Sequence, residues 1–126
     1  MTAAVTLSFE ADTRNVALAR TVAATMAARA DLPLDQLEDV RLAVDEAVSQ
    51  AILAAPRGGV IDLEFLETPA GLDITVRAPS STLDPPPTDT FSWMVLSALV
   101  DRVSAVVEDG QLRLDLQVVR GLTVDA

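Results

Sequence analysis

The chain has 126 residues, half of them apolar, which suits one folded domain with a sizeable core. It contains neither cysteine nor histidine. This excludes disulfides, thiol nucleophiles, the usual zinc sites and histidine general bases, so any chemistry must use carboxylates, hydroxyls or a bound metal. The formal net charge of −10 argues against nucleic acid, which is itself polyanionic, and favours a basic protein partner.

The sequence predicts neither a membrane segment nor a second domain. No apolar run is long enough to span a bilayer, and residues 1–10 lack the basic start and continuous apolar stretch of a signal peptide. We therefore expect no membrane association and a cytoplasmic location. We find no internal repeat and no domain boundary, and we expect a single domain over residues 1–126.

The first predicted element is a half-buried strand at residues 5–9, where apolar and polar residues alternate. Asp12 or Thr13 then caps a helix that continues to the link before the next helix. Arg14 and Arg20 lie off the centre of its apolar stripe. They are either candidate partner contacts or arginines that simply solvate the helix.

The longest predicted helix spans residues 35–54, and Asp35 with Glu38 three residues later indicates a capping box at its start. One side of this helix is apolar and should face the core. On the opposite side Glu46 and Gln50 lie one turn apart, with leucines around them. An acid and an amide on such a face suit a pocket wall, a packed interface or an ordinary polar patch.

After this helix the apolar period changes to two, which predicts a hairpin of strands at residues 61–65 and 72–76. Residues 78–90 contain three consecutive prolines and predict a loop, either a functional one or a plain connector. Helical spacing returns over residues 91–101. Two further strands are expected around a turn at residues 109–110.

The order strand, helix, helix, two strands, helix, two strands predicts an α+β fold. We expect a two-layer sandwich in which the helices cover one face of a mixed, mainly antiparallel sheet. This order, together with RLAVDEAVSQAI at residues 41–52, resembles the bacterial anti-sigma factors with a GHKL-type, Bergerat-like ATPase fold. That family includes the switch-protein serine kinases of sporulation and general stress.

The similarity covers nearly the whole chain, and TFSWMVLSALVDRV at residues 90–103 is similar to the actinobacterial branch that restrains sigma factor F. The resemblance implies that the protein sequesters an alternative sigma factor and is released by an anti-anti-sigma protein of the STAS type. It also implies a homodimer. A dimer is favoured independently, because the first strand could otherwise present an apolar sheet edge to solvent.

By the same resemblance, Glu46 matches the family's catalytic base and Gln50 its magnesium-binding asparagine. Glutamine is one methylene longer, and magnesium tolerates poor geometry badly. Ala78 and Ser80 match the adenine-reading aspartate and the glycine two residues after it. Residues 90–93 replace a glycine-rich, phosphate-binding turn with side chains that would fill the space. We therefore expect a degenerate ATP site with a vestigial base, no metal and no bound cofactor.

Three functions are compatible with these residues. The expected one is sigma factor binding, in which Arg20 matches a partner-contacting arginine of the family and Arg14 is the next candidate. The alternative is an active serine/threonine kinase that phosphorylates its anti-anti-sigma partner, with Glu46 as base, Gln50 as magnesium ligand, and ATP with magnesium as cofactor. The third is a small two-layer scaffold module with no sigma partner.

Overall fold

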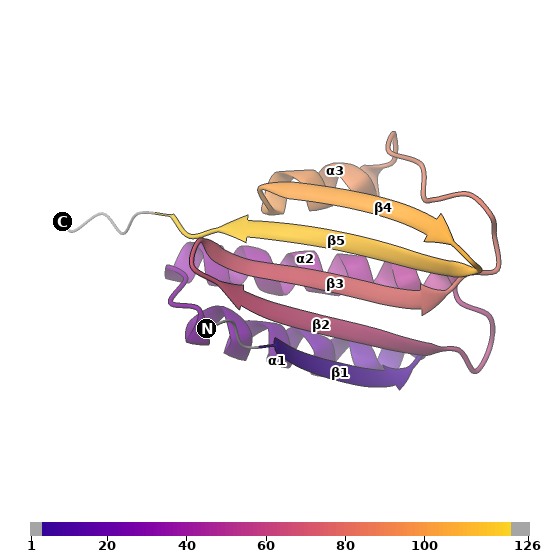
Figure 1. The fold of residues 1–126 in the computed structure, drawn as a ribbon, viewed down its shortest axis with the longest axis horizontal. Coiled ribbons are helices and arrows are strands. Elements are labelled where there is room, and N and C mark those ends of the chain that lie inside the picture. The colour runs from indigo at the N-terminus through magenta and orange to yellow at the C-terminus, as the bar shows by residue number, and fades with distance from the viewer. Residues whose placement is uncertain (1–3, 122–126) are drawn as a thin grey trace.

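The computed structural model describes residues 4–121, and within them the elements follow the predicted order (Figure 1). They are β1 (Ala4–Glu10), η1 (Thr13–Asn15), α1 (Val16–Arg29), α2 (Leu34–Ala54), β2 (Val60–Thr68), β3 (Gly71–Pro79), α3 (Phe91–Leu99), β4 (Arg102–Glu108) and β5 (Gln111–Val119). No helix in this range is both long and apolar enough to cross a membrane.

The strands form one sheet in the order β1-β2-β3-β5-β4. All four pairings among the described strands are antiparallel, so the expectation of a mixed sheet was wrong in that detail. The connections explain this. Two helices connect β1 to β2 and return the chain to the end where β1 stopped, so β2 runs antiparallel to β1. A single helix connects β3 to β4, but β5 lies between these two strands and pairs with both.

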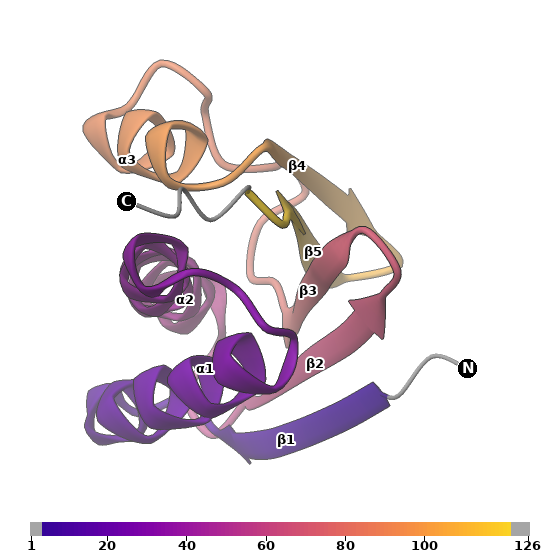
Figure 2. The same cartoon turned by 90° about the vertical axis from the view of Figure 1, so that its left-hand side faces the viewer.

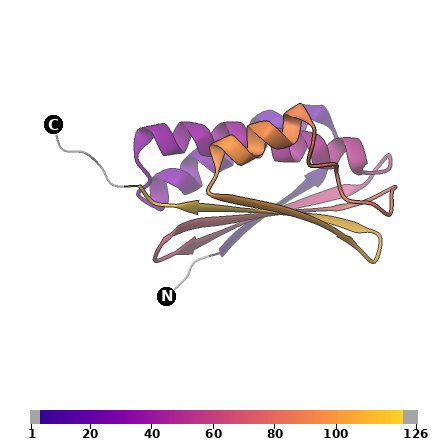
Figure 3. The same ribbon diagram turned by 90° about the horizontal axis from the view of Figure 1, so that it is seen from above.

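The helices cover one face of the sheet and leave the other open (Figures 2 and 3). In these views α2 lies in the middle of the helical layer, between α1 and α3. The core lies between the layers, where alternate strand residues meet the apolar side of α2. Its fully buried side chains include Val40, Val44, Val48, Ile61, Leu63, Phe65, Leu72, Ile74, Leu96, Leu112, Leu114 and Leu116.

The start of α2 differs from the prediction. The helix begins at Leu34 with Pro33 as its N-cap residue, and no side chain caps it. Proline fits this place because its fixed φ suits the entry to a helix. Asp35 is therefore already inside the first turn. Its Oδ1 accepts a hydrogen bond from the backbone amide of Gln36 at 3.0 Å. Glu38 pairs with an arginine further along α2 instead of reaching back, so the predicted capping box is absent.

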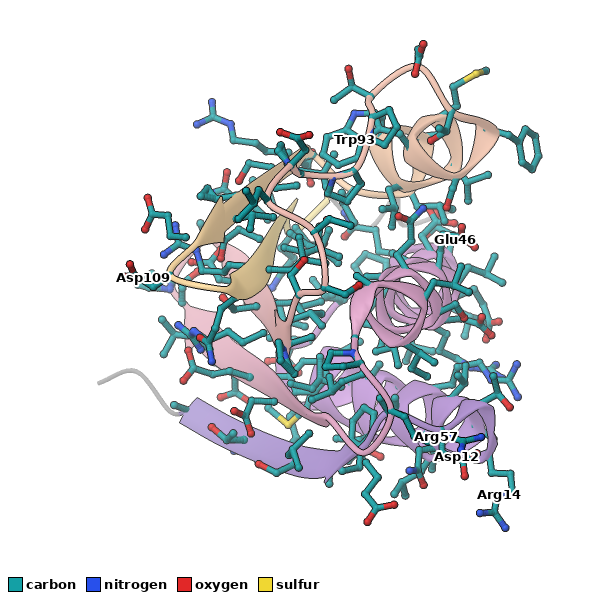
Figure 4. The ribbon with its side chains drawn as sticks, turned by 90° about the vertical axis from the view of Figure 1, so that its right-hand side faces the viewer. Asp12, Arg14, Glu46, Arg57, Trp93 and Asp109 are labelled. Atoms are coloured by element: carbon teal, nitrogen blue, oxygen red, sulfur yellow. The ribbon has the colours of Figure 1, made fainter. Side chains whose placement is uncertain are left out.

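The hairpin turn between β4 and β5 is the predicted one. Asp109 and Gly110 have φ values of +52° and +75°. Two successive residues with positive φ are what a two-residue turn of the hairpin type requires, and aspartate followed by glycine tolerates them. Figure 4 marks this turn by Asp109, at the opposite end of the view from Arg14.

Candidate functional site

The carboxylate of Glu46 and the amide of Gln50 lie on the flank of α2 that faces α3, and both side chains are half-buried (Figure 4 labels Glu46). Their one-turn spacing places them on the same side of the helix. The buried side chains of α2 are directed to the sheet, so this flank is free to meet α3. Of the alternatives left open by the sequence, the structure supports two. Glu46 and Gln50 make a packed contact with α3, and Gln50 also lines a cavity beside the proline loop.

Ser92 of α3 lies between these two side chains. Its Oγ donates a hydrogen bond to Glu46 Oε1 and accepts one from Gln50 Nε2. The hydroxyl therefore occupies the space between the residue that matches the catalytic base and the residue that matches the magnesium ligand. A usable signal for Ser92 was present in the sequence, since it precedes Leu96, the fully buried residue of α3, by one helical turn.

The start of α3 uses its own side chains to satisfy its backbone. Thr90 is the N-cap residue, and its Oγ1 accepts the Trp93 amide at 3.2 Å. Trp93 is half-buried and packs against the core. Phe91 does not pack in this way, since its side chain is 80% exposed. An aromatic residue at the first helical position points away from the core here because Ser92 and Leu96 take the inward positions.

The two adenine-site positions carry no group that reads a base. Ala78 lies inside β3, opposite Leu112 of β5, and is buried. Its methyl group offers no acceptor for an amino group. Ser80 is the first residue after the strand, and its Oγ donates to the Thr82 carbonyl at 3.0 Å while its amide donates to the Gly110 carbonyl at 2.8 Å. Its polar groups are thus engaged locally.

A cavity of about 600 Å³ lies between the end of α2, the proline loop at residues 80–90 and β5. Its walls are mostly apolar or hydroxyl-bearing, and Asp84 is the charged residue among them. Among the described residues, no lysine or arginine lines it. A polyphosphate placed here would meet a carboxylate and no countercharge, which is electrostatically unfavourable. Within residues 4–121 no group of three or more carboxylates is placed to hold a metal ion.

Arg20 lies beside the flank of α2 that is opposite the Ser92 contact. Its Nη1 is 2.8 Å from Oδ2 of Asp45, and this ion pair joins α1 to α2. The Arg20 side chain remains 42% exposed and its partner 30%. The sequence analysis missed Asp45, although it is the acid of α2 that helical spacing directs toward α1. Arg20 is thus oriented by a carboxylate of its own chain and still reaches the surface.

Arg14 belongs to a separate surface, at the outer end of α1 (Figure 4). Asp12 caps η1 by accepting the Arg14 amide at 2.9 Å, and its carboxylate also pairs with the Arg14 guanidinium at 2.7 Å. The hydrogen bonds from the Arg14 side chain and amide hold the pKa of Asp12 below its usual value. The structure does not bring Arg14, Arg20 and Glu46 together, whereas Gln50 and Ser80 line the same cavity beside the proline loop.

The fold and these positions define the class. Residues 9–117 match the histidine kinase-like ATPase domain family, and the chain belongs to it.

Within that class, the chain is 34% identical over 100 residues to the anti-sigma-F factor RsbW of Mycobacterium tuberculosis, in strains CDC 1551 / Oshkosh and ATCC 25618 / H37Rv. The matched part is 79% of this chain and 60% of that protein, so the chain spans less than two thirds of the relatives' length. A crystal structure of the RsbU and RsbW domains of Rv1364c from Mycobacterium tuberculosis has a similar fold, with a TM-score of 0.67 at 14% identity. The structural match covers 96% of this chain and 35% of the chain in the crystal structure.

Proposed function

We propose that this chain is an anti-sigma domain that binds a sigma-F-type sigma factor, keeps it from RNA polymerase, and is relieved by a STAS-type anti-anti-sigma protein. The observation that carries the proposal is the closed contact of Glu46 and Gln50 on Ser92, in a chain whose sequence relative is an anti-sigma-F factor. This contact favours a binding protein over a kinase. The proposal includes a cytoplasmic location, where sigma factors act.

The proposal also includes a degenerate ATP site. Ala78 supplies no acceptor to an adenine, the cavity beside the proline loop has no cationic lining, and the Trp93 amide at the start of α3 is already bonded to Thr90. The residues present do not fit a magnesium nucleotide. Each of these features weakens nucleotide binding by a different physical cause, so restoring one position would not restore the site.

The charge of the chain supports the class of partner. The net charge of −10 attracts basic patches on a protein and repels nucleic acid. A homodimer is part of the proposal, because among the described strands β1 lies at the edge of the sheet and pairs with β2 alone. Its inward residues Val5 and Leu7 are only half-buried in the single chain. A second copy could cover this edge.

Two measurements test the proposal. The full chain should form a stable complex with the sigma-F-type sigma factor of its own organism in size-exclusion chromatography. Millimolar ATP with magnesium should leave the melting temperature unchanged, whereas a ligand at about a hundred times its dissociation constant adds about 2.7 kcal/mol of stability. Failure to bind the sigma factor would favour the scaffold module.

The kinase alternative remains specific enough to test, since Glu46 is retained and half-buried. It requires that Ser92 move away and that Gln50 bind magnesium through its carbonyl oxygen. A clear rise in melting temperature with ATP, followed by transfer of labelled phosphate to a STAS-type protein, would establish it. Transfer that persists in the Glu46→Gln variant would contradict the role of Glu46 as base.

A further inference from the structure

Helix α3 has an apolar side that the other residues in the described range, 4–121, do not cover. Its nine residues, FSWMVLSAL, include no charged side chain, and Leu96 alone among them is fully buried. Phe91 is 80% exposed and Met94 64% exposed. A helix that is apolar on all sides is normally enclosed by protein. Here one side faces solvent.

The exposed apolar residues of α3 share a face with those of α2. Phe91, Met94 and Ala98 recur at helical spacing on the side of α3 opposite Leu96. On α2, Leu42 is 55% exposed and Leu53 85%, both on the side away from the sheet. The two helices lie on the same side of the sheet (Figure 3), and we call their five exposed apolar residues together the apolar crest.

Carboxylates border the crest. Asp39 and Glu46, the latter bonded to Ser92, lie on the α3 side of α2, and Asp89 lies just before α3. From residue 78 to residue 101 the sequence has no lysine or arginine. The arginine of α2, Arg41, is engaged in an ion pair with Glu38 at 3.1 Å. An apolar surface bordered by one sign of charge is a feature of protein interaction sites.

We propose that the apolar crest binds an amphipathic helix of a protein partner, with apolar residues on one side and lysine or arginine along its flanks. This rests on the proposed function, in which the partner is the sigma factor. Phe91 is the aromatic anchor expected at the centre of such a contact. A helix suits the crest because exposed apolar side chains of two neighbouring helices can receive an i, i+3, i+4, i+7 stripe.

The carboxylates that border the crest argue against two other occupants, a second copy of the chain and an anionic membrane. A second copy of the chain joined through a twofold axis would bring its own acidic border against this one, and like charges repel. An anionic membrane surface is repelled for the same reason. A basic helix gains attraction from the same carboxylates, and that attraction should weaken as salt is added.

The test uses a peptide of about 18 residues of leucine and lysine patterned as an amphipathic helix. Calorimetry should show that it binds the full chain, and that the double variant Phe91→Lys, Met94→Lys binds it at least about tenfold more weakly. Val60→Lys is the matched control, because Val60 is 50% exposed on the open face of the sheet. The control should bind like the unaltered chain. A leucine and glutamate peptide of the same pattern should not bind.

The sigma factor provides the second arm. If the unaltered chain and the double variant bind it equally, the crest is not the contact, while the proposed function stands. If the unaltered chain binds no sigma factor but binds the leucine and lysine peptide at the crest, the proposed function fails and the inference stands. Equal peptide binding by both lysine variants overturns the inference. So does a dimer that the double variant turns into a monomer, because the crest would then lie between two copies.

Discussion

Ser92 is the residue of α3 that bonds both polar side chains on the facing flank of α2. Replacing it with alanine leaves the Glu46 carboxylate and the Gln50 amide without their shared partner. We expect Ser92→Ala to lower the free energy of unfolding by about 1–3 kcal/mol, towards the lower end because both groups are half-buried and water can reach them. Urea denaturation followed by circular dichroism measures this.

The matched control is Ser97→Ala, which removes an exposed hydroxyl from the same helix. It should change the stability by less than about 0.5 kcal/mol. Equal midpoints for Ser92→Ala and Ser97→Ala would show that the Ser92 contact adds nothing to the stability of the fold.

Replacing the single residue Arg20 should affect partner binding and the stability of the fold differently. Its ion pair with Asp45 is partly exposed, so Arg20→Ala should cost less than about 1 kcal/mol of stability. If Arg20 contacts a carboxylate of the sigma factor, the same change should weaken that complex by about 2–5 kcal/mol. The affinity is measured by calorimetry and the melting temperature by scanning calorimetry. Arg14→Ala is the control, and sigma binding that survives Arg20→Ala but not Arg14→Ala would reverse the assignment.

Among the elements, two glycines test how the sheet is joined. A Cβ added to Gly71, at the start of β3, would overlap the backbone carbonyl oxygen of Val118 in β5. At Gly110 a Cβ meets nothing within 4 Å, and only the φ of +75° opposes it. We expect Gly110→Ala to cost about 1–2 kcal/mol and Gly71→Ala up to about 3, since backbone cannot yield as a side chain does. A larger loss of unfolding free energy for Gly110→Ala would contradict this.

The elements were largely predictable because their signals are local. Alternation identified β2 and β3, and helical spacing placed α2 within a residue of its observed bounds. The proline loop begins two residues later than expected, because Ala78 and Pro79 continue β3. What could not be predicted depends on contacts between distant residues. The Ser92 contact spans 42 and 46 positions, and the antiparallel sheet depends on β5 lying between β3 and β4.

For the whole molecule, the prediction is a homodimer. The exposed edge of β1 and the half-buried Val5 and Leu7 favour a contact between two copies there. Light scattering at micromolar concentration should give twice the 13.3 kDa mass of the chain. Phe91→Lys should leave this mass unchanged, because the crest and β1 belong to different parts of the fold. A monomeric mass at every concentration would contradict the prediction.

The insertion of both long helices between β1 and β2 has a consequence for how the chain folds. The β2–β3 and β4–β5 hairpins close over turns of two residues, whereas β1 must wait for the segment from Glu10 to Val60 to fold back. Closing that longer loop costs more entropy, so β1 joins the sheet late and is released before the hairpins open. Its backbone amides therefore lose protection from hydrogen exchange first. A partner that pairs with β1 would slow that exchange without altering the opening of the hairpins.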